Sequence, residues 1–94
     1  VNIYNESNST ISEGNFGGSF RTGVVGVDYD YKGNLWITNP FTNNPLQLRT
    51  IDGTFVEMDL GNDLGPNDLV GEVMVTRDGY VWVILPRGGG LLVF

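Results

Sequence analysis

One internal repeat constrains the fold of this chain more than any other feature. The sequence KGNLWITN at residues 32–39 returns in altered form as DGYVWVIL at residues 78–85. In each copy a glycine lies three positions before a tryptophan. The glycine suits a tight turn, and the side chains that follow it are expected to point alternately outward and inward, as in a strand. The two glycines and the two tryptophans are each 46 positions apart. The chain therefore contains two copies of one strand-forming unit.

A repeat period in the forties, with a turn and a tryptophan strand in each unit, is typical of β-propeller blades. The predicted fold class is all-β, with blades of four antiparallel strands and about two blades' worth of strands. Glycine and proline interrupt every window that could hold a helix, so no helix is expected. Strands are expected at residues 24–29, 34–39, 46–50, 55–59, 69–75, 80–85 and 91–94.

This pattern predicts four segments along the chain. Residues 1–23 are expected to hold the end of a preceding blade, a strand at 1–4, and then a long loop at 5–23. Residues 24–59 are expected to form a complete blade with two apolar faces. Residues 60–68 connect it to a partial blade at residues 69–94. The predicted apolar faces draw on Val27, Leu35, Trp36, Leu46 and Met58.

The predicted loop at residues 5–23 is rich in Asn, Ser, Thr and Gly, and its large apolar residues are Ile11, Phe16 and Phe20. Loops of more than about 12–15 residues are usually functional or disordered. Two interpretations stay open, a mobile connection between blades and a binding loop. In either case this stretch is expected to be the least ordered part of the chain.

Charge and composition exclude several functions. The net charge is −6 over 94 residues and the five Lys and Arg residues form no cluster, so nucleic acid and anionic membranes are poor partners. The chain has no cysteine and no histidine. It therefore lacks a disulfide framework, the commonest metal ligand and the commonest general base. We expect no enzyme activity, no cofactor and no membrane insertion in this segment.

Two loops resemble ligand sites only in part. Asp28, Asp30 and Asn34 begin like a calcium loop, but Lys32 occupies the fifth position and the twelfth holds no Glu. An aspartate-mediated turn is the better interpretation, and no metal site is expected. The glycines at 88–90 lack the Lys-Ser/Thr and the helix of a phosphate-binding loop, which favours a simple strand connection.

Aromatic residues supply the remaining candidates for binding. Trp36 and Trp82 occupy the same position in both copies, which favours packing between sheets over a sugar-stacking site. Tyrosines near turns that are not repeated are better candidates for ligand contact. The predicted ligand-binding residues are Tyr29, Tyr31, Tyr80 and Arg87.

The pattern D-x-x-G-x-Φ-W-Φ, where Φ is apolar, occurs at residues 30–37 and one position closer at 78–83. It resembles the two-component regulator propeller repeat, which builds periplasmic sensor propellers of bacterial hybrid histidine kinases, particularly in Bacteroidota, and surface propellers of the type IX secretion apparatus. The resemblance covers about residues 24–94. The loop at residues 40–45 is longer than the family's usual Thr/Asn-Gly-Leu loop and is somewhat more similar to the secretion propellers.

The resemblance implies a noncatalytic recognition module, a fragment of a periplasmic ligand-sensing propeller in a two-component signal transduction system. Its partner would be a small molecule, a glycan or a protein. One alternative is a cell-surface propeller of type IX secretion that mediates protein interaction, and a second is a propeller lyase, since similar repeats occur in such enzymes. In each case the location would be periplasmic or extracellular.

A chain with two blades would expose apolar sheet faces at both ends. We therefore expect these faces to be covered by the remaining blades of a propeller or by a homo-oligomer. Residues 1–4 could add as a strand to the edge formed by residues 91–94 of another copy.

Overall fold

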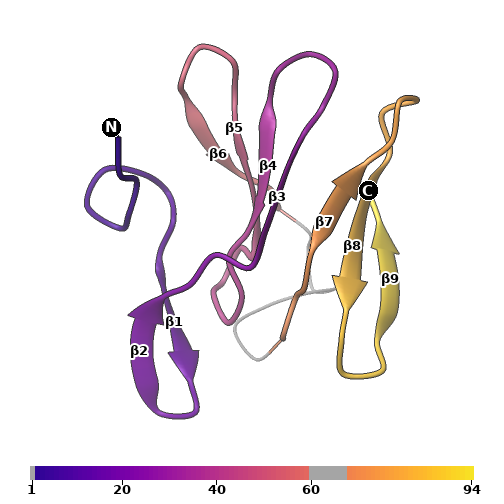
Figure 1. Ribbon diagram of the computed structural model, residues 1–94. Coiled ribbons are helices and arrows are strands. Elements are labelled where there is room, and N and C mark those ends of the chain that lie inside the picture. The colour runs from indigo at the N-terminus through magenta and orange to yellow at the C-terminus, as the bar shows by residue number, and fades with distance from the viewer. Residues whose placement is uncertain (1, 60–67) are drawn as a thin grey trace.

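Alternating apolar residues and glycine turns arrange the described part of this chain as nine strands in three antiparallel sheets (Figure 1). The computed structural model describes residues 2–59 and 68–94. The expectation of an all-β chain is confirmed, because the described residues contain no helix. Among these residues the sheets do not close into a ring (Figure 1). The strands are β1 (Glu13–Phe16), β2 (Ser19–Thr22), β3 (Gly26–Tyr29), β4 (Leu35–Thr38), β5 (Leu46–Arg49), β6 (Phe55–Glu57), β7 (Val73–Val75), β8 (Val81–Leu85) and β9 (Gly90–Val93).

The predicted four-stranded sheet at residues 24–59 is confirmed. Strands β3, β4, β5 and β6 pair with their neighbours in chain order, so the sheet is a simple antiparallel meander. Strands β7, β8 and β9 form a second meander of three strands. The predicted strand at 69–75 is shorter than expected, because regular pairing in β7 begins only at Val73. The predicted connection at 60–68 lies outside the described residues except for Asp68.

The expectation for the first 23 residues was wrong in two respects. The stretch predicted as a long loop contains the hairpin β1–β2, whose strands pair from Glu13 with Thr22 to Phe16 with Ser19. Gly17 and Gly18 join them at φ of 64° and 94°, the backbone that a two-residue hairpin turn requires. Residues 2–4 form no strand, and the Asn8 side-chain amide instead donates to the Ile3 carbonyl at 2.8 Å.

Three turns share one hydrogen-bond pattern and lie at the same end of the molecule (Figure 1). In each, the first residue donates its N–H to the carbonyl of the fifth and accepts from the N–H of a glycine at the fourth. These glycines have φ between 86° and 94°, where other residues are strained. The turns span residues 30–34, 50–54 and 76–80. The turn positions expected from the repeated glycine are thus confirmed.

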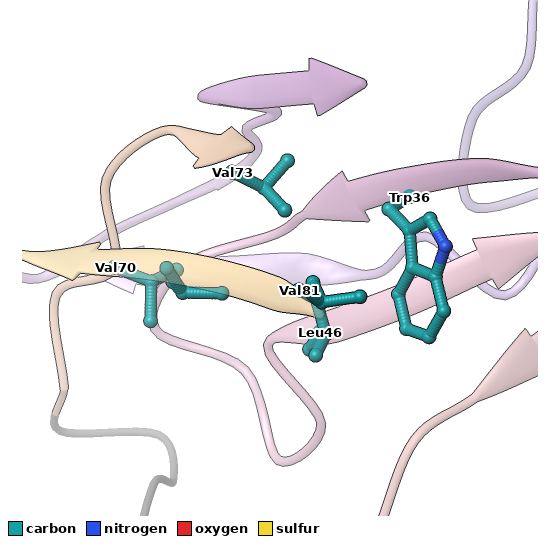
Figure 2. Close-up of a cluster of buried hydrophobic side chains, with 6 residues drawn as sticks. Trp36, Leu46, Val70, Val73 and Val81 are labelled. Carbon is teal, nitrogen blue, oxygen red and sulfur yellow. The ribbon is translucent and has the colours of Figure 1, made fainter. Parts of the chain in front are cut away.

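The two meanders pack face to face around one apolar cluster (Figure 2). Trp36 and Leu46 of the four-stranded sheet meet valines from β7 and β8, while the Trp36 ring lies 6.0 Å from that of Phe94. Partly buried Met58 packs against the same cluster. Val27 and Leu35, predicted for the apolar faces, lie on the opposite face of this sheet. The cluster consists of Trp36, Leu46, Val70, Val73, Val81 and Val83.

Strands β3 and β7 lie side by side where the two sheets meet (Figure 1). A Cβ added to Gly26 would lie 2.7 Å from the Cα of Glu72, so only glycine permits this approach. Two side chains add hydrogen bonds across the contact. The Thr38 hydroxyl donates to the Gly71 carbonyl at 2.8 Å, and the Asp28 carboxylate accepts from the Val75 N–H at 2.8 Å.

A methyl group at residue 26 should force the two sheets apart. We expect Gly26→Ala to lower the free energy of unfolding by about 1–3 kcal/mol, because the obstructing atoms belong to the backbone and cannot turn away. Urea unfolding followed by tryptophan fluorescence measures this. Val25→Ala is the matched control, since Val25 is 46% exposed and should change stability by less than about 0.5 kcal/mol. Equal stability of both variants would contradict the close approach.

Candidate functional site

A buried polar network joins the β1–β2 hairpin to the four-stranded sheet. Asn39, which follows β4, is fully buried, and its side-chain amide donates to the carbonyls of Ser12 and Gly23 at 3.1 and 2.7 Å. Its side-chain oxygen accepts from the Ser12 N–H at 2.9 Å and from the Gln47 amide at 3.1 Å. Gln47 is 1% exposed and accepts from the Thr10 hydroxyl at 2.7 Å. The segment on each side of the hairpin is thereby fixed to the sheet.

Aromatic contacts also hold the hairpin against the β4–β5 loop. The Phe16 ring of β1 lies 5.0 Å from the Phe41 ring in an edge-to-face arrangement. The Arg21 guanidinium stands 4.5 Å over Phe16, and that of Arg87 stands 5.6 Å over Phe41. The hairpin, the β4–β5 loop and the β8–β9 loop therefore form one connected surface at the end opposite the three turns (Figure 1).

A cleft of about 530 Å³ lies between this hairpin and the β4–β5 loop, and we name it the hairpin cleft. Its lining is mostly polar, with amide and hydroxyl groups beside two carboxylates. One of these carboxylates, Glu57, accepts from the Asn44 side-chain amide at 2.7 Å. Phe20, which also lines the cleft, is 67% exposed. The lining residues are Ser12, Glu13, Asn15, Phe20, Phe41, Thr42, Asn43, Asn44 and Glu57.

Phe41 has an unusual backbone in the wall of this cleft. Its φ is 60°, and it is the only residue other than glycine with a positive φ among those described. A bulky side chain in this region costs free energy, and such positions cluster at functional sites. The strained loop is stabilised by the hydrogen bond from the Thr42 hydroxyl to the Asn39 carbonyl at 2.7 Å. The cleft is therefore shaped before any ligand enters.

The structure does not bring the four predicted ligand-binding residues together. Tyr29 lies in an apolar groove on the outer face of the four-stranded sheet. Tyr31 lines a second cleft, between turns 30–34 and 76–80, which we name the turn cleft. Tyr80 is 53% exposed at the end of turn 76–80. Arg87 contacts Phe41, so it is the candidate that adjoins the hairpin cleft.

Asp30 shapes the turn cleft as an aspartate-mediated turn, as predicted. One carboxylate oxygen accepts from the N–H groups of Lys32 and Asn34 at 3.0 and 2.9 Å. The other accepts from the Asn34 amide at 3.1 Å and the Trp36 indole N–H at 3.2 Å. Desolvation raises the pKa of Asp30, but the hydrogen bonds from Asn34, Trp36 and Lys32 together outweigh it and leave the pKa below its usual value. These bonds use the oxygens that a cation would need.

Two further observations on the described residues concern metals and membranes. Within residues 2–59 and 68–94, no three His, Cys, Asp or Glu side chains gather as a metal site would require. The same residues contain no helix long and apolar enough to cross a membrane.

Comparison of the chain with protein-family models, curated proteins and solved structures finds no match.

The hairpin cleft was not predicted from the sequence. The predicted ligand-binding residues do not include Phe20, Asn43, Asn44 or Glu57, which line it. One sequence signal did exist, because Gly17-Gly18 between two short polar segments is typical of a tight hairpin. A hairpin at that position places Phe20 beside Asn15 in the register that the structure shows.

Removal of the buried amide at Asn39 should loosen the hairpin more than it disturbs the sheet. We expect Asn39→Ala to remove a hydrogen-bond partner from part-buried Ser12 and Gly23 and from buried Gln47, and to lower stability by about 1–3 kcal/mol. Hydrogen exchange should accelerate most in β1 and β2. Asn43→Ala is the control, because Asn43 is exposed. If β1 and β2 exchanged no faster in Asn39→Ala than in the control, the network would not be what holds the hairpin.

The lowered pKa of Asp30 predicts a stability that depends on acid pH. Its folded-state pKa lies below the unfolded value of about 3.9, so the ionised carboxylate stabilises the fold above that pH, and this is lost as pH falls through the folded-state pKa. Asp30→Asn should therefore be less stable near neutral pH and should lose less stability between about pH 4 and 2. Urea midpoints at several pH values measure this. Parallel pH curves for variant and parent would contradict it.

Proposed function

We propose that this protein is a noncatalytic recognition module that binds its ligand in the hairpin cleft. The observation that carries the proposal is a polar cleft whose walls are fixed in advance by the buried Asn39 and Gln47 amides. Loops held on a rigid sheet are where proteins commonly place binding residues. A preformed site loses less conformational entropy when a ligand binds.

The chemistry of the cleft favours a neutral ligand that is rich in hydroxyl groups, either a small molecule or a glycan. The side-chain amides of Asn15, Asn43 and Asn44 both donate and accept hydrogen bonds. The exposed Phe20 ring offers an apolar face for stacking. The carboxylates of Glu13 and Glu57, in a chain of net charge −6, repel anions.

The wider context of this proposal rests on the resemblance of the repeat to the two-component regulator propellers. In that context the stacked meanders are propeller blades, and the module senses a ligand in the periplasm or at the cell surface for a histidine kinase. The absence of histidine and cysteine from the whole chain supports recognition over catalysis.

Chemical-shift perturbation by a neutral glucan hexasaccharide and by its sulfated counterpart tests the proposal. The neutral probe should shift the amide resonances of residues 13–20 and 41–44, and the sulfated probe should bind at least tenfold more weakly, about 1.4 kcal/mol or more. The decisive variants are Phe20→Ala and Tyr31→Ala, which truncate exposed aromatic residues of the hairpin cleft and the turn cleft.

Loss of the hairpin stacking contact should weaken binding by about 1–2 kcal/mol, whereas Tyr31→Ala should leave it unchanged. If Tyr31→Ala weakened binding more than loss of the hairpin stacking contact did, the site would lie in the turn cleft and Tyr31 would be the ligand contact. Tighter binding of the sulfated probe would show that the assignment of ligand charge is wrong.

A further inference from the structure

Each of the two packed meanders has a second face that no described residue covers fully. On the four-stranded sheet, Val27 and Tyr29 are 56% and 65% exposed beside a groove of about 390 Å³. On the three-stranded sheet, Met74, Leu91 and Val93 are 58%, 60% and 45% exposed. Contiguous exposed apolar surfaces of this kind usually mark interaction sites.

The 46-residue repeat relates these uncovered faces to the two faces that are already packed together. Val73, Val81 and Val83, on the inner face of the three-stranded sheet, are 6%, 2% and 1% exposed. Their equivalents 46 positions earlier are Val27, Leu35 and Ile37, on the outer face of the four-stranded sheet, where Val27 is exposed and Ile37 is already buried. The valine face of the three-stranded sheet, which packs on the four-stranded sheet, therefore has a counterpart on the outer face of the four-stranded sheet.

The tryptophan face is also present twice. Trp36 packs inside the contact between the sheets, whereas its equivalent Trp82 pairs with Met74 and Val93 on the outer face of the three-stranded sheet. Trp82 is only half-buried there. The described residues therefore leave one tryptophan face and one valine face partly exposed, and the contact between the two meanders shows how such faces fit.

We infer that the outer face of β7–β9 in one molecule packs on the outer face of β3–β6 in a second copy of this chain. The partner is assigned because the internal contact between the meanders already joins the same two kinds of face in this order. The contact is heterologous, so each molecule in a pair keeps one free face and further copies can add. Residues 2–4, expected to exchange as a strand, are not needed for it.

Arg49 identifies the centre of the new contact. Its Nε is buried and has no hydrogen-bond partner among the described residues, and the Tyr4 ring lies 5.5 Å from the guanidinium. Arg49 pairs with Leu35 across the sheet, and the equivalent of Leu35, Val81, pairs with Phe94. Arg49 is thus equivalent to Phe94, which Trp36 contacts inside the molecule. Trp82 of the second copy accordingly stacks on Arg49 as a cation–π pair.

Two single variants and their mixture test the direction of the contact. Val27→Asp places a charge on the valine face and Met74→Asp places one on the tryptophan face, at sites of nearly equal exposure. Analytical ultracentrifugation of the unaltered chain should show a mass that rises with concentration. Each variant alone should remain monomeric, and an equimolar mixture should form a one-to-one heterodimer, because each retains the face that the other lacks.

Several results would overturn the inference. These are an unaltered chain that stays monomeric at high micromolar concentration, a variant that still associates alone, or a mixture that remains monomeric. Circular dichroism verifies that each variant is folded, and Val27→Ser with Met74→Ser replaces any aspartate variant that is not. Association of the serine variants as strong as that of the parent chain would equally overturn it.

Arg49→Gln tests the predicted pairing with Trp82. It should weaken association about two- to fivefold, the effect of losing one exposed cation–π contact. Arg21→Gln is the matched control, because Arg21 stacks on Phe16 of the hairpin and does not line the groove, and it should leave association unchanged. Equal effects of the two substitutions would remove Arg49 from the contact.

Discussion

The close approach of strand β3 to strand β7 is the constraint on which the rest of the structure depends. Gly26 permits it, and the Thr38 hydroxyl bridges it by accepting from the Gly26 N–H at 2.9 Å and donating to the Gly71 carbonyl. Because the backbones are this close, Trp36 can fill the space between the sheets and reach Phe94. The two meanders therefore behave as one packed unit, with its turns at one end and its longer loops at the other (Figure 1).

The buried amides carry this order from the sheets to the hairpin. A hairpin of two short strands is marginally stable alone in water, so β1–β2 needs external support. Asn39 supplies it with side-chain bonds to both sides of the hairpin, in a fully buried setting where an unpaired amide would be costly. The shape of the hairpin cleft is thus a consequence of packing in the sheet, and the loop residues inherit their positions from it.

Local chemistry explains what the sequence could predict. Glycine at φ near 90° fixes each turn within a few residues, so the repeated Gly33 and Gly79 predicted a strand on either side of each turn, although β7 is shorter than expected. The hairpin was missed because the Gly17-Gly18 turn lies within a stretch of small polar residues typical of a loop. The cleft depends on Asn39 contacting residues 16 and 27 positions away, and no local pattern encodes such contacts. Tyrosines that are not repeated between the two copies were predicted as ligand contacts, but the fold places them on separate surfaces.

The two proposed surfaces are distinct but share a segment of chain. None of the residues that line the hairpin cleft lines the groove on the outer face of the four-stranded sheet. Ile11, which is 5% exposed, nevertheless lines that groove, while its neighbour Ser12 lines the cleft and is bonded to Asn39. Asn39 already holds Ser12, and Ile11 is already buried, so this segment has little freedom left to lose when either surface is occupied. The two surfaces are therefore expected to be filled independently, because coupling through conformational entropy requires a segment that binding would order.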